Sequence, residues 1–383
     1  MPRSLQNPFD ALDTTEVNVR DFVGTFSDVV LEDAAPLFRP GNVVVKGMQG
    51  AGKSMLLGLL KPEVRLAYHE AGRQFPVSDD RAKFVCASIN LTQSGVSAFG
   101  HRMHATPFAG SEIEVPLMFA DFLNYHLVRD LLRAISILGD QRHKALGDAI
   151  GIDASAPKLD HFASILCVDE CWLNALKLHT SYTALDKALG ARLSSYRAFL
   201  SFNSDSLPEE FARTKSQIGA PLSAAVRALN EAEVLSRDTR VFVAVDQFEE
   251  LLYQRSLNDA LTDPFRQIIN KAFGSRDPSV SYRVGSRAYA WNLGSLKQFG
   301  TDKRLESGRD YIEVDLDAAM RRSESAKDWL FPKLAEDIFR RRMRQAGYDE
   351  IASQKIRLQR FLEMRHPLKS ARENTPERIP KSL

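Results

Sequence analysis

In this 383-residue chain, the sequence VVVKGMQGAGKSMLLGLL at residues 43–60 is the strongest indication of the fold. The β-branched run at its start predicts a short strand over residues 42–46, buried on both faces as in a parallel sheet. The leucine-rich end predicts a helix over residues 53–60. The turn between them fits the pattern G-x-x-x-x-G-K-[S/T] at every fixed position. This turn consists of Gly47, Met48, Gln49, Gly50, Ala51, Gly52, Lys53 and Ser54.

A strand, a glycine-rich turn and a helix in this order are what a phosphate-binding loop needs. Successive backbone N–H groups in such a loop curl around phosphate oxygens, and the helix that follows adds the positive end of its dipole. Lys53 is placed to reach the β- and γ-phosphates of a nucleotide, and Ser54 to ligate Mg²⁺. A glycine-rich turn that ends in Lys-Ser by chance is the alternative, which the strand–helix context disfavours.

A second stretch, VFVAVDQFEELL, supplies the carboxylate that a nucleotide-bound metal needs. It predicts a buried strand over residues 240–246, and Asp246 stands at the end of that strand. The carboxyl ends of parallel strands meet at one edge of the sheet, so we expect Asp246 to lie beside the phosphate loop and to hold Mg²⁺. The alternative is an aspartate that caps the helix after the strand.

Further strands are expected at residues 83–91, 281–288 and 310–317, and they alternate with helical segments. The pattern predicts helices over residues 117–138, 182–200, 221–235, 264–274 and 294–304, and a loop from the second strand to about residue 114. This alternation indicates an α/β fold in which a parallel sheet is flanked by helices. We therefore predict a P-loop NTPase core with a large helical insertion and a C-terminal helical lid.

The two motifs, GMQGAGKS and VDQFEEL, resemble those of the STAND and origin-recognition-like branches of the AAA+ ATPases. The resemblance implies that ATP and Mg²⁺ bind, that Asp246 holds the metal through water, and that a nearby acid polarises the attacking water. Gln247 stands where many AAA+ members carry the catalytic glutamate, so hydrolysis is expected to be slow. Glu249 and Glu250 are candidate substitutes, and each could equally be a surface or helix-start charge.

The resemblance also suggests further site residues. Arg287, at the end of the strand 281–288, is a candidate sensor of the γ-phosphate, with a solvated arginine as the equal alternative. Three weaker candidates follow from the same resemblance. Arg304 or Arg309 could be an arginine finger, and Arg321 or Arg322 could be a second sensor. Asn7–Phe9 and Phe22–Gly24 could line an adenine pocket.

The expected domain organisation has four parts. Residues 1–40 form an N-terminal segment, and residues 41–317 form the ATPase domain, with a helical insertion at about residues 140–237. A helical lid covers residues 318–365, and a basic tail covers residues 366–383. Residues 339–383 hold twelve Lys or Arg and five Asp or Glu, although the whole chain carries only +2. This basic region could contact DNA phosphates or could be the solvated face of a helix.

Composition narrows the class of protein. No stretch is long and apolar enough to cross a membrane, the N-terminus does not resemble a signal peptide, and three cysteines suggest a reducing compartment, so we expect a cytoplasmic location.

The main functional hypothesis is an ATP-dependent switch, either as a homo-oligomer or with a partner protein, in a bacterial defence or signalling assembly. The alternatives are a DNA-associated initiator- or loader-like ATPase and a scaffold that never hydrolyses ATP.

Overall fold

The computed structural model describes residues 18–105, 111–252, 263–293, 296–321 and 330–348. The chain divides into two compact units. The larger unit comprises residues 31–319, and the smaller one combines residues 1–30 with residues 320–383.

A five-stranded parallel sheet forms the centre of the larger unit. Its strands are β1 (Val43–Lys46), β2 (Phe84–Asn90), β3 (Arg240–Asp246), β4 (Val280–Ser286) and β5 (Ile312–Asp315). They lie in the order β2-β3-β4-β1-β5, and every neighbouring pair is parallel. The carboxyl ends of all five strands therefore face the same edge of the sheet.

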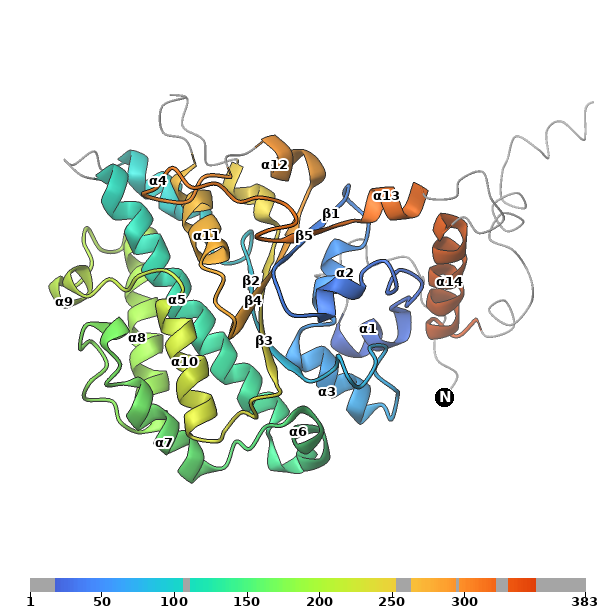
Figure 1. The fold of residues 1–383 in the computed structure, drawn as a ribbon, viewed down its shortest axis with the longest axis horizontal. Helices are drawn as coiled ribbons and strands as arrows, with labels where there is room; N and C mark the ends of the chain where they lie inside the picture. Colours follow the sequence, from blue (N-terminus) through green and yellow to red (C-terminus); the bar gives the residue numbers. More distant parts are fainter. Residues whose placement is uncertain (1–17, 106–110, 253–262, 294–295, 322–329, 349–383) are drawn as a thin grey trace, which may run out of the picture. The chain divides into compact units, whose positions relative to one another are not determined.

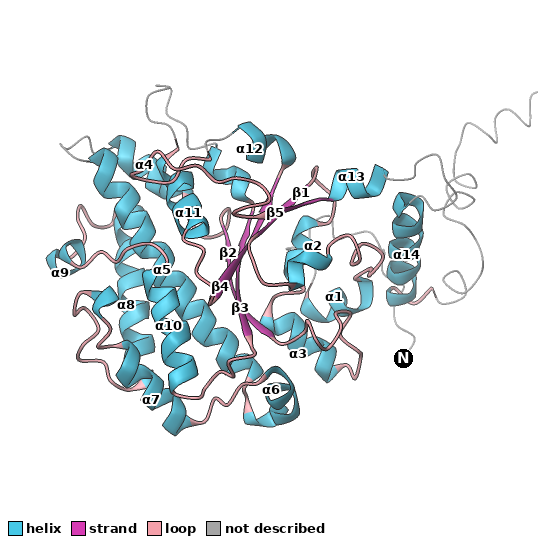
Figure 2. Ribbon diagram, in the orientation of Figure 1, coloured by secondary structure: helices cyan, strands magenta, loops and turns pink. Residues whose placement is uncertain are grey.

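Helices cover both faces of this sheet (Figure 1). Figure 2 shows α5, α8, α10 and α11 on one side of the strands and α2 on the other. The α-helices among the described residues of this unit are α2 (Lys53–Gly58), α3 (Pro62–Glu70), α4 (Ser97–Ala105), α5 (Ser111–Leu138), α6 (Lys144–Ile150), α7 (Ala156–Leu166), α8 (Tyr182–Leu200), α9 (Glu209–Arg213), α10 (Ala220–Glu231), α11 (Pro264–Gly274), α12 (Ala288–Leu293) and α13 (Leu316–Arg321). The last of these, α13, crosses into the smaller unit at Met320. The prediction of an α/β core with a parallel sheet flanked by helices is confirmed.

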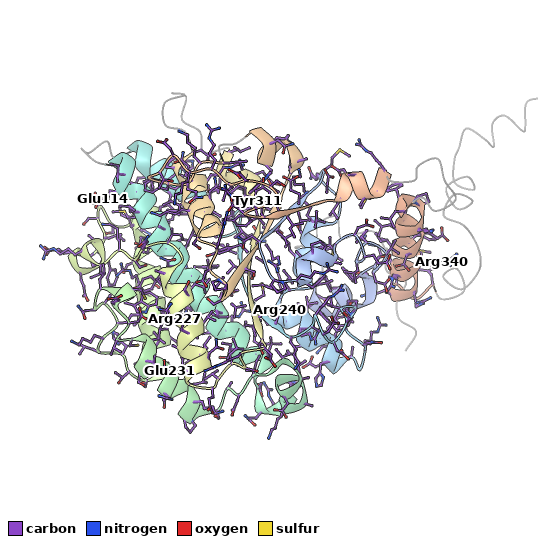
Figure 3. The ribbon with its side chains drawn as sticks, in the orientation of Figure 1. Glu114, Arg227, Glu231, Arg240, Tyr311 and Arg340 are labelled. Atoms are coloured by element: carbon purple, nitrogen blue, oxygen red, sulfur yellow. The ribbon has the colours of Figure 1, made fainter. Side chains whose placement is uncertain are left out.

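Side chains fill the space between the sheet and the helices (Figure 3). The longest helix, α5, packs along the sheet and buries an apolar stripe that includes Val128, Leu131 and Ile135. The helical layer also contains a fully buried charged pair, in which Arg192 Nε lies 2.8 Å from Asp121 Oδ2. A buried charge needs such a partner, because desolvation of an unpaired ion is costly.

The same carboxylate of Asp121 joins three segments of the helical layer. It accepts hydrogen bonds from the Tyr196 hydroxyl on α8, at 2.7 Å, and from the Ser216 N–H that precedes α10, also at 2.7 Å. Asp121 itself lies on α5. This network fixes the positions of α5, α8 and the chain before α10 relative to one another.

Two local predictions are wrong. The expected loop after β2 contains α4, whose Phe99 is fully buried against the core. The helix expected over residues 294–304 is irregular chain from residue 296, because α11 takes up its backbone hydrogen bonds. The Phe299 N–H donates to Gln267 O at 3.0 Å, and the Asn270 side chain donates to Lys297 O at 2.9 Å.

The smaller unit contains α1 (Val19–Thr25) and α14 (Leu330–Gln345) among its described residues. Phe22 and Val23 on α1 and Phe339 and Met343 on α14 are buried. The arginines of α14 are partly neutralised by acids one turn earlier, since Nε of Arg340 lies 2.9 Å from Glu336 and Nε of Arg341 lies 2.7 Å from Asp337.

None of the helices in the described residues is long and apolar enough to span a membrane.

Candidate nucleotide-binding site

The phosphate loop leaves the sheet at the carboxyl end of β1 and leads directly into α2. Gly50 and Gly52 have φ angles of +82° and +93°. L-residues rarely adopt this region, whereas glycine enters it without steric cost. The glycines at these two positions therefore follow from the shape of the backbone itself.

Lys53 lies over its own loop. Its side-chain nitrogen donates hydrogen bonds to the carbonyl oxygens of Gly47 and Met48, both at 2.8 Å. Burial lowers the pKa of Lys53, and the carboxylates of Glu249 and Asp246 act against that shift. The ammonium group thus stands where the loop, β3 and the segment after β3 converge.

Asp246 ends β3 on the same edge of the sheet. Its carboxylate has a hydrogen bond with the Ser54 side chain and accepts another from the N–H of Gln247 at 2.9 Å. Burial raises the pKa of Asp246, so its charged form would gain from a cation.

A carboxylate beside a hydroxyl is a donor set that suits Mg²⁺, which prefers oxygen ligands. In the described residues, no group of three or more His, Cys, Asp and Glu side chains gathers to hold a metal alone. Mg²⁺ usually takes one or two protein ligands and completes its shell with water and phosphate oxygens, so Ser54 and Asp246 fit the metal of a bound nucleotide.

Gln247 follows Asp246 in a left-handed conformation, with φ of +59°. Its side-chain oxygen accepts a hydrogen bond from the hydroxyl of Thr92, just beyond β2. The N–H of Leu91 donates to Asp246 O at 3.1 Å, which joins the ends of the two strands. Sequence analysis missed Thr92, which is an exposed polar residue with no motif around it.

Glu249 and Glu250 have different surroundings, although they are adjacent in the short 3₁₀ helix Phe248–Leu252. Glu249 is only 6% exposed, whereas Glu250 is partly exposed. The Glu249 carboxylate accepts from both the backbone N–H and Nε of Arg287, each at 3.2 Å. Of these two acids, Glu249 is therefore the one that the structure joins to Arg287.

Arg287 links that acid to the phosphate loop. It lies just beyond β4, which stands between β1 and β3 in the sheet. Its Nη2 atom also donates to Gln49 Oε1 at 3.4 Å. The structure thus brings together the loop, Asp246, Gln247, Glu249 and Arg287 at one edge of the sheet.

A family model described as ORC-CDC6-like matches residues 7–381. The chain belongs to the ORC-CDC6-like family. The origin-recognition side of the resemblance is confirmed by this match, and the relationship is to AAA+ ATPases; the STAND branch stays a prediction. Searches of curated proteins and of solved structures found no match.

Asp317 is an acidic residue beside the phosphate loop that the sequence did not indicate. Asp317, in the first turn of α13, accepts a hydrogen bond from the Met48 N–H of the phosphate loop. Burial lowers the pKa of Lys53, and the charge of Asp317 is a small opposing contribution. No local pattern marks Asp317, because 269 residues separate it from its partner.

The weaker arginine candidates have other surroundings. Arg309 forms ion pairs with Glu306 and Asp310, and Arg304 lies in the irregular chain before β5. Arg321 is exposed at the end of α13. Phe22 and Val23 are buried in the smaller unit, and Asn7–Phe9 and Arg322 lie outside the described residues.

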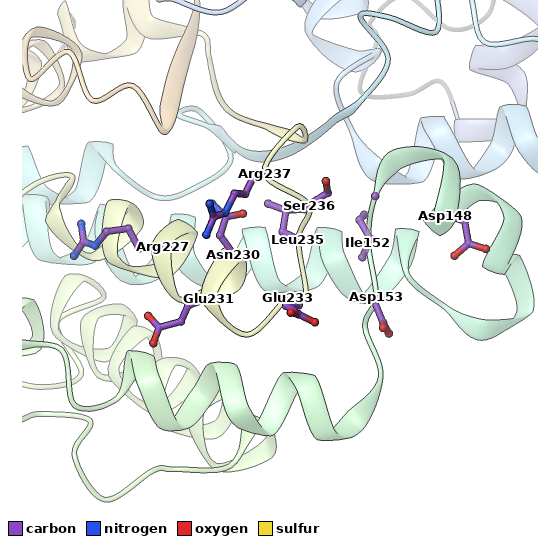
Figure 4. A pocket seen from close by; sticks show the side chains of 11 residues that line it. Asp148, Ile152, Asp153, Arg227, Asn230, Glu231, Glu233, Leu235, Ser236 and Arg237 are labelled. Atoms are coloured by element: carbon purple, nitrogen blue, oxygen red, sulfur yellow. The ribbon is translucent and has the colours of Figure 1, made fainter.

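The ORC-CDC6-like chain also has a cavity of about 930 Å³ at the opposite edge of the sheet, before the start of β3 (Figure 4). Side chains near the end of α6 and from α10 line it, including Asp148, Asp153, Arg227 and Glu231. It is separate from the phosphate loop, because the loop follows the carboxyl end of β1.

Proposed function

We propose that this protein binds ATP with Mg²⁺ and acts as a slowly hydrolysing molecular switch of the STAND type. The observation that carries the proposal is the meeting of Lys53, Ser54 and Asp246 at the carboxyl ends of β1 and β3. Lys53 offers its ammonium group to the phosphates, and the loop N–H groups orient them. Mg²⁺, when bound, would neutralise phosphate charge beside Ser54 and Asp246.

Slow hydrolysis follows from the side chains near the attacking water. Gln247 supplies an amide, which orients a water molecule but accepts no proton. We propose that Glu249 accepts that proton; its carboxylate contacts Arg287 twice, each time at 3.2 Å. We propose that a γ-phosphate competes for Arg287 and thereby frees Glu249, so that the base works only when ATP is fully seated.

The switch would act as a homo-oligomer or with a partner protein, in a defence or signalling assembly. The setting is proposed because the D-Q-F-E-E-L sequence that starts at Asp246 resembles that of STAND-type ATPases. A nucleotide-dependent change in assembly is the behaviour that defines such a switch.

A DNA-associated initiator or loader is the second candidate, and the ORC-CDC6-like match favours it. The pairing of Arg340 and Arg341 with acids on the same helix reduces the charge that α14 offers to a phosphate backbone. DNA-stimulated turnover would favour the loader, and ATP binding without turnover under any condition would favour the scaffold.

The decisive experiment compares wild type with Lys53→Ala. Calorimetry with ATP and Mg²⁺ measures affinity, light scattering measures assembly with and without nucleotide, and phosphate release is followed with and without duplex DNA. A charge-assisted hydrogen bond contributes about 1.5–3 kcal/mol, so Lys53→Ala should weaken ATP binding about tenfold to a hundredfold. Unchanged affinity in a folded variant would refute the proposed function.

A further inference from the structure

The phosphate loop and α13 leave the sheet side by side. β1 and β5 are parallel neighbours, and their last residues, Lys46 and Asp315, are paired. The loop starts directly after β1, and α13 starts directly after β5. Leu316, the first residue of α13, is fully buried, so the start of this helix is anchored against the core.

Asp317 joins these two segments. Its Oδ1 and Oδ2 atoms lie 3.0 and 2.9 Å from the Met48 nitrogen, so both carboxylate oxygens accept from one loop N–H. Burial lowers the pKa of Lys53, and the negative charge of Asp317 is one of those that partly offset this shift. Asp317 is thus near the group that would receive the phosphates, although its hydrogen bond is to the first part of the loop.

We propose that Asp317 is a positioning residue for the phosphate loop and that its charge opposes ATP binding. The inference rests on the proposed function, because it concerns the same nucleotide. The Asp317 carboxylate and the phosphates of Mg·ATP are both negatively charged, so they repel each other when the phosphates occupy the loop that Asp317 contacts. Coupling between two binding events is reciprocal. If the Asp317 contact with the Met48 N–H weakens ATP binding by some factor, bound ATP weakens that contact by the same factor.

Through the hydrogen bond between Met48 and Asp317, a nucleotide in the phosphate loop would affect α13. The chain passes from the larger to the smaller compact unit at Met320, within the same short helix. Loss of the Asp317 contact when ATP binds would therefore loosen the segment that connects the two units. ADP, which carries less charge, would loosen it less.

The test separates the charge of Asp317 from its hydrogen bond. Asp317→Asn keeps an acceptor oxygen and removes the charge, so ATP should bind about three- to tenfold more tightly, and ADP should gain less. Asp317→Ala removes both, so its ATP affinity should fall below that of Asp317→Asn. Calorimetry with each nucleotide and Mg²⁺ measures these affinities.

Asp315→Asn is the matched control. The Asp315 carboxylate accepts from the Ala318 N–H at 2.9 Å as the cap of α13. Asparagine caps a helix about as well as aspartate, so this variant removes one charge from the same turn and keeps the helix. Its ATP affinity should remain within about twofold of wild type, because the Asp315 carboxylate bonds to the Ala318 N–H of its own helix, whereas Asp317 bonds to the phosphate loop.

Hydrogen exchange of residues 316–321 gives a readout independent of affinity. Exchange in wild type should become faster when Mg·ATP is added, and Asp317→Asn should lose this response. The inference is overturned if wild type shows no response, if Asp317→Asn does not bind ATP more tightly, or if Asp315→Asn has the same effect. If these occur while Lys53→Ala still weakens ATP binding, the proposed function stands without it.

Discussion

Glu249→Gln should make ATP bind more tightly and hydrolyse more slowly. The variant removes a negative charge that pairs with Arg287 and also acts on Lys53. Glutamine has nearly the same volume and can still accept one hydrogen bond. The substitution therefore changes the electrostatics of the site more than its packing.

The expected gain in affinity follows from the two contacts of Glu249 with Arg287, each at 3.2 Å. A hydrogen bond to a charged group contributes about 1.5–3 kcal/mol. The Arg287 side chain is 33% exposed, so solvent screens this pair. With one bond kept by the amide, a net release of about 1–2 kcal/mol frees Arg287 for the γ-phosphate, which corresponds to about five- to thirtyfold tighter ATP binding.

The expected loss in turnover is larger. General-base assistance contributes about 10²–10⁴-fold to a rate, and glutamine cannot accept the proton. Single-turnover hydrolysis with saturating ATP and Mg²⁺ measures the chemical step, and calorimetry measures affinity. A merely destabilised site would bind ATP more weakly, so the opposite signs of the two effects identify the role of Glu249.

Glu250→Gln is the control, since Glu250 is adjacent but partly exposed. It should hydrolyse and bind ATP as wild type does. Wild-type turnover in Glu249→Gln would refute the assignment, and a slow Glu250→Gln would transfer the role of the base to the neighbouring acid.

Three other variants test the rest of the structure. Mg²⁺ should tighten ATP binding by wild type but not by Asp246→Asn, when titrations with and without Mg²⁺ are compared. Because burial raises the pKa of Asp246, this carboxylate becomes protonated at a higher pH than an ordinary aspartate. Wild type should therefore lose the effect of Mg²⁺ at that higher pH. Gln247→Glu should raise single-turnover hydrolysis by about tenfold or more if a missing carboxylate limits the rate, and no increase would contradict that explanation. Asp121→Asn should lower the free energy of unfolding by about 3 kcal/mol in urea titrations, because it leaves Arg192 buried without its anion; a loss below about 1 kcal/mol would show that the network is dispensable.

Local patterns predicted the elements that hold the motifs. The apolar runs Val43–Val45 and Val241–Val245, which precede the two motifs, are continuous and short, which is typical of strands buried on both faces. Pro264 at the first turn and Gly274 at the end marked α11 for similar local reasons. These features depend on neighbours in the sequence, so the sequence alone was sufficient to predict them.

Contacts between distant residues were not predictable in this way. Nothing near Asp317 indicates that it meets Met48, and nothing near Glu249 distinguishes it from Glu250 until Arg287 is placed beside it. The expected helix over residues 294–304 failed for the same reason. Its apolar residues Leu296 and Phe299 do pack against the core, but hydrogen bonds to α11 replace those of a helix.

The position of β1 in the sheet has a consequence for protein synthesis. Among the strands that the structure describes, β1 is the first to leave the ribosome, yet its partners are β4 and β5. Asn42, next to β1, accepts a hydrogen bond from the N–H of Tyr282, 240 residues later. At roughly 5–20 residues per second, β1 must wait about 12–48 s for its first partner strand. The apolar residues Val43–Val45 therefore have no partner strand until β4 has been synthesised, so they are exposed to non-native contacts throughout that time.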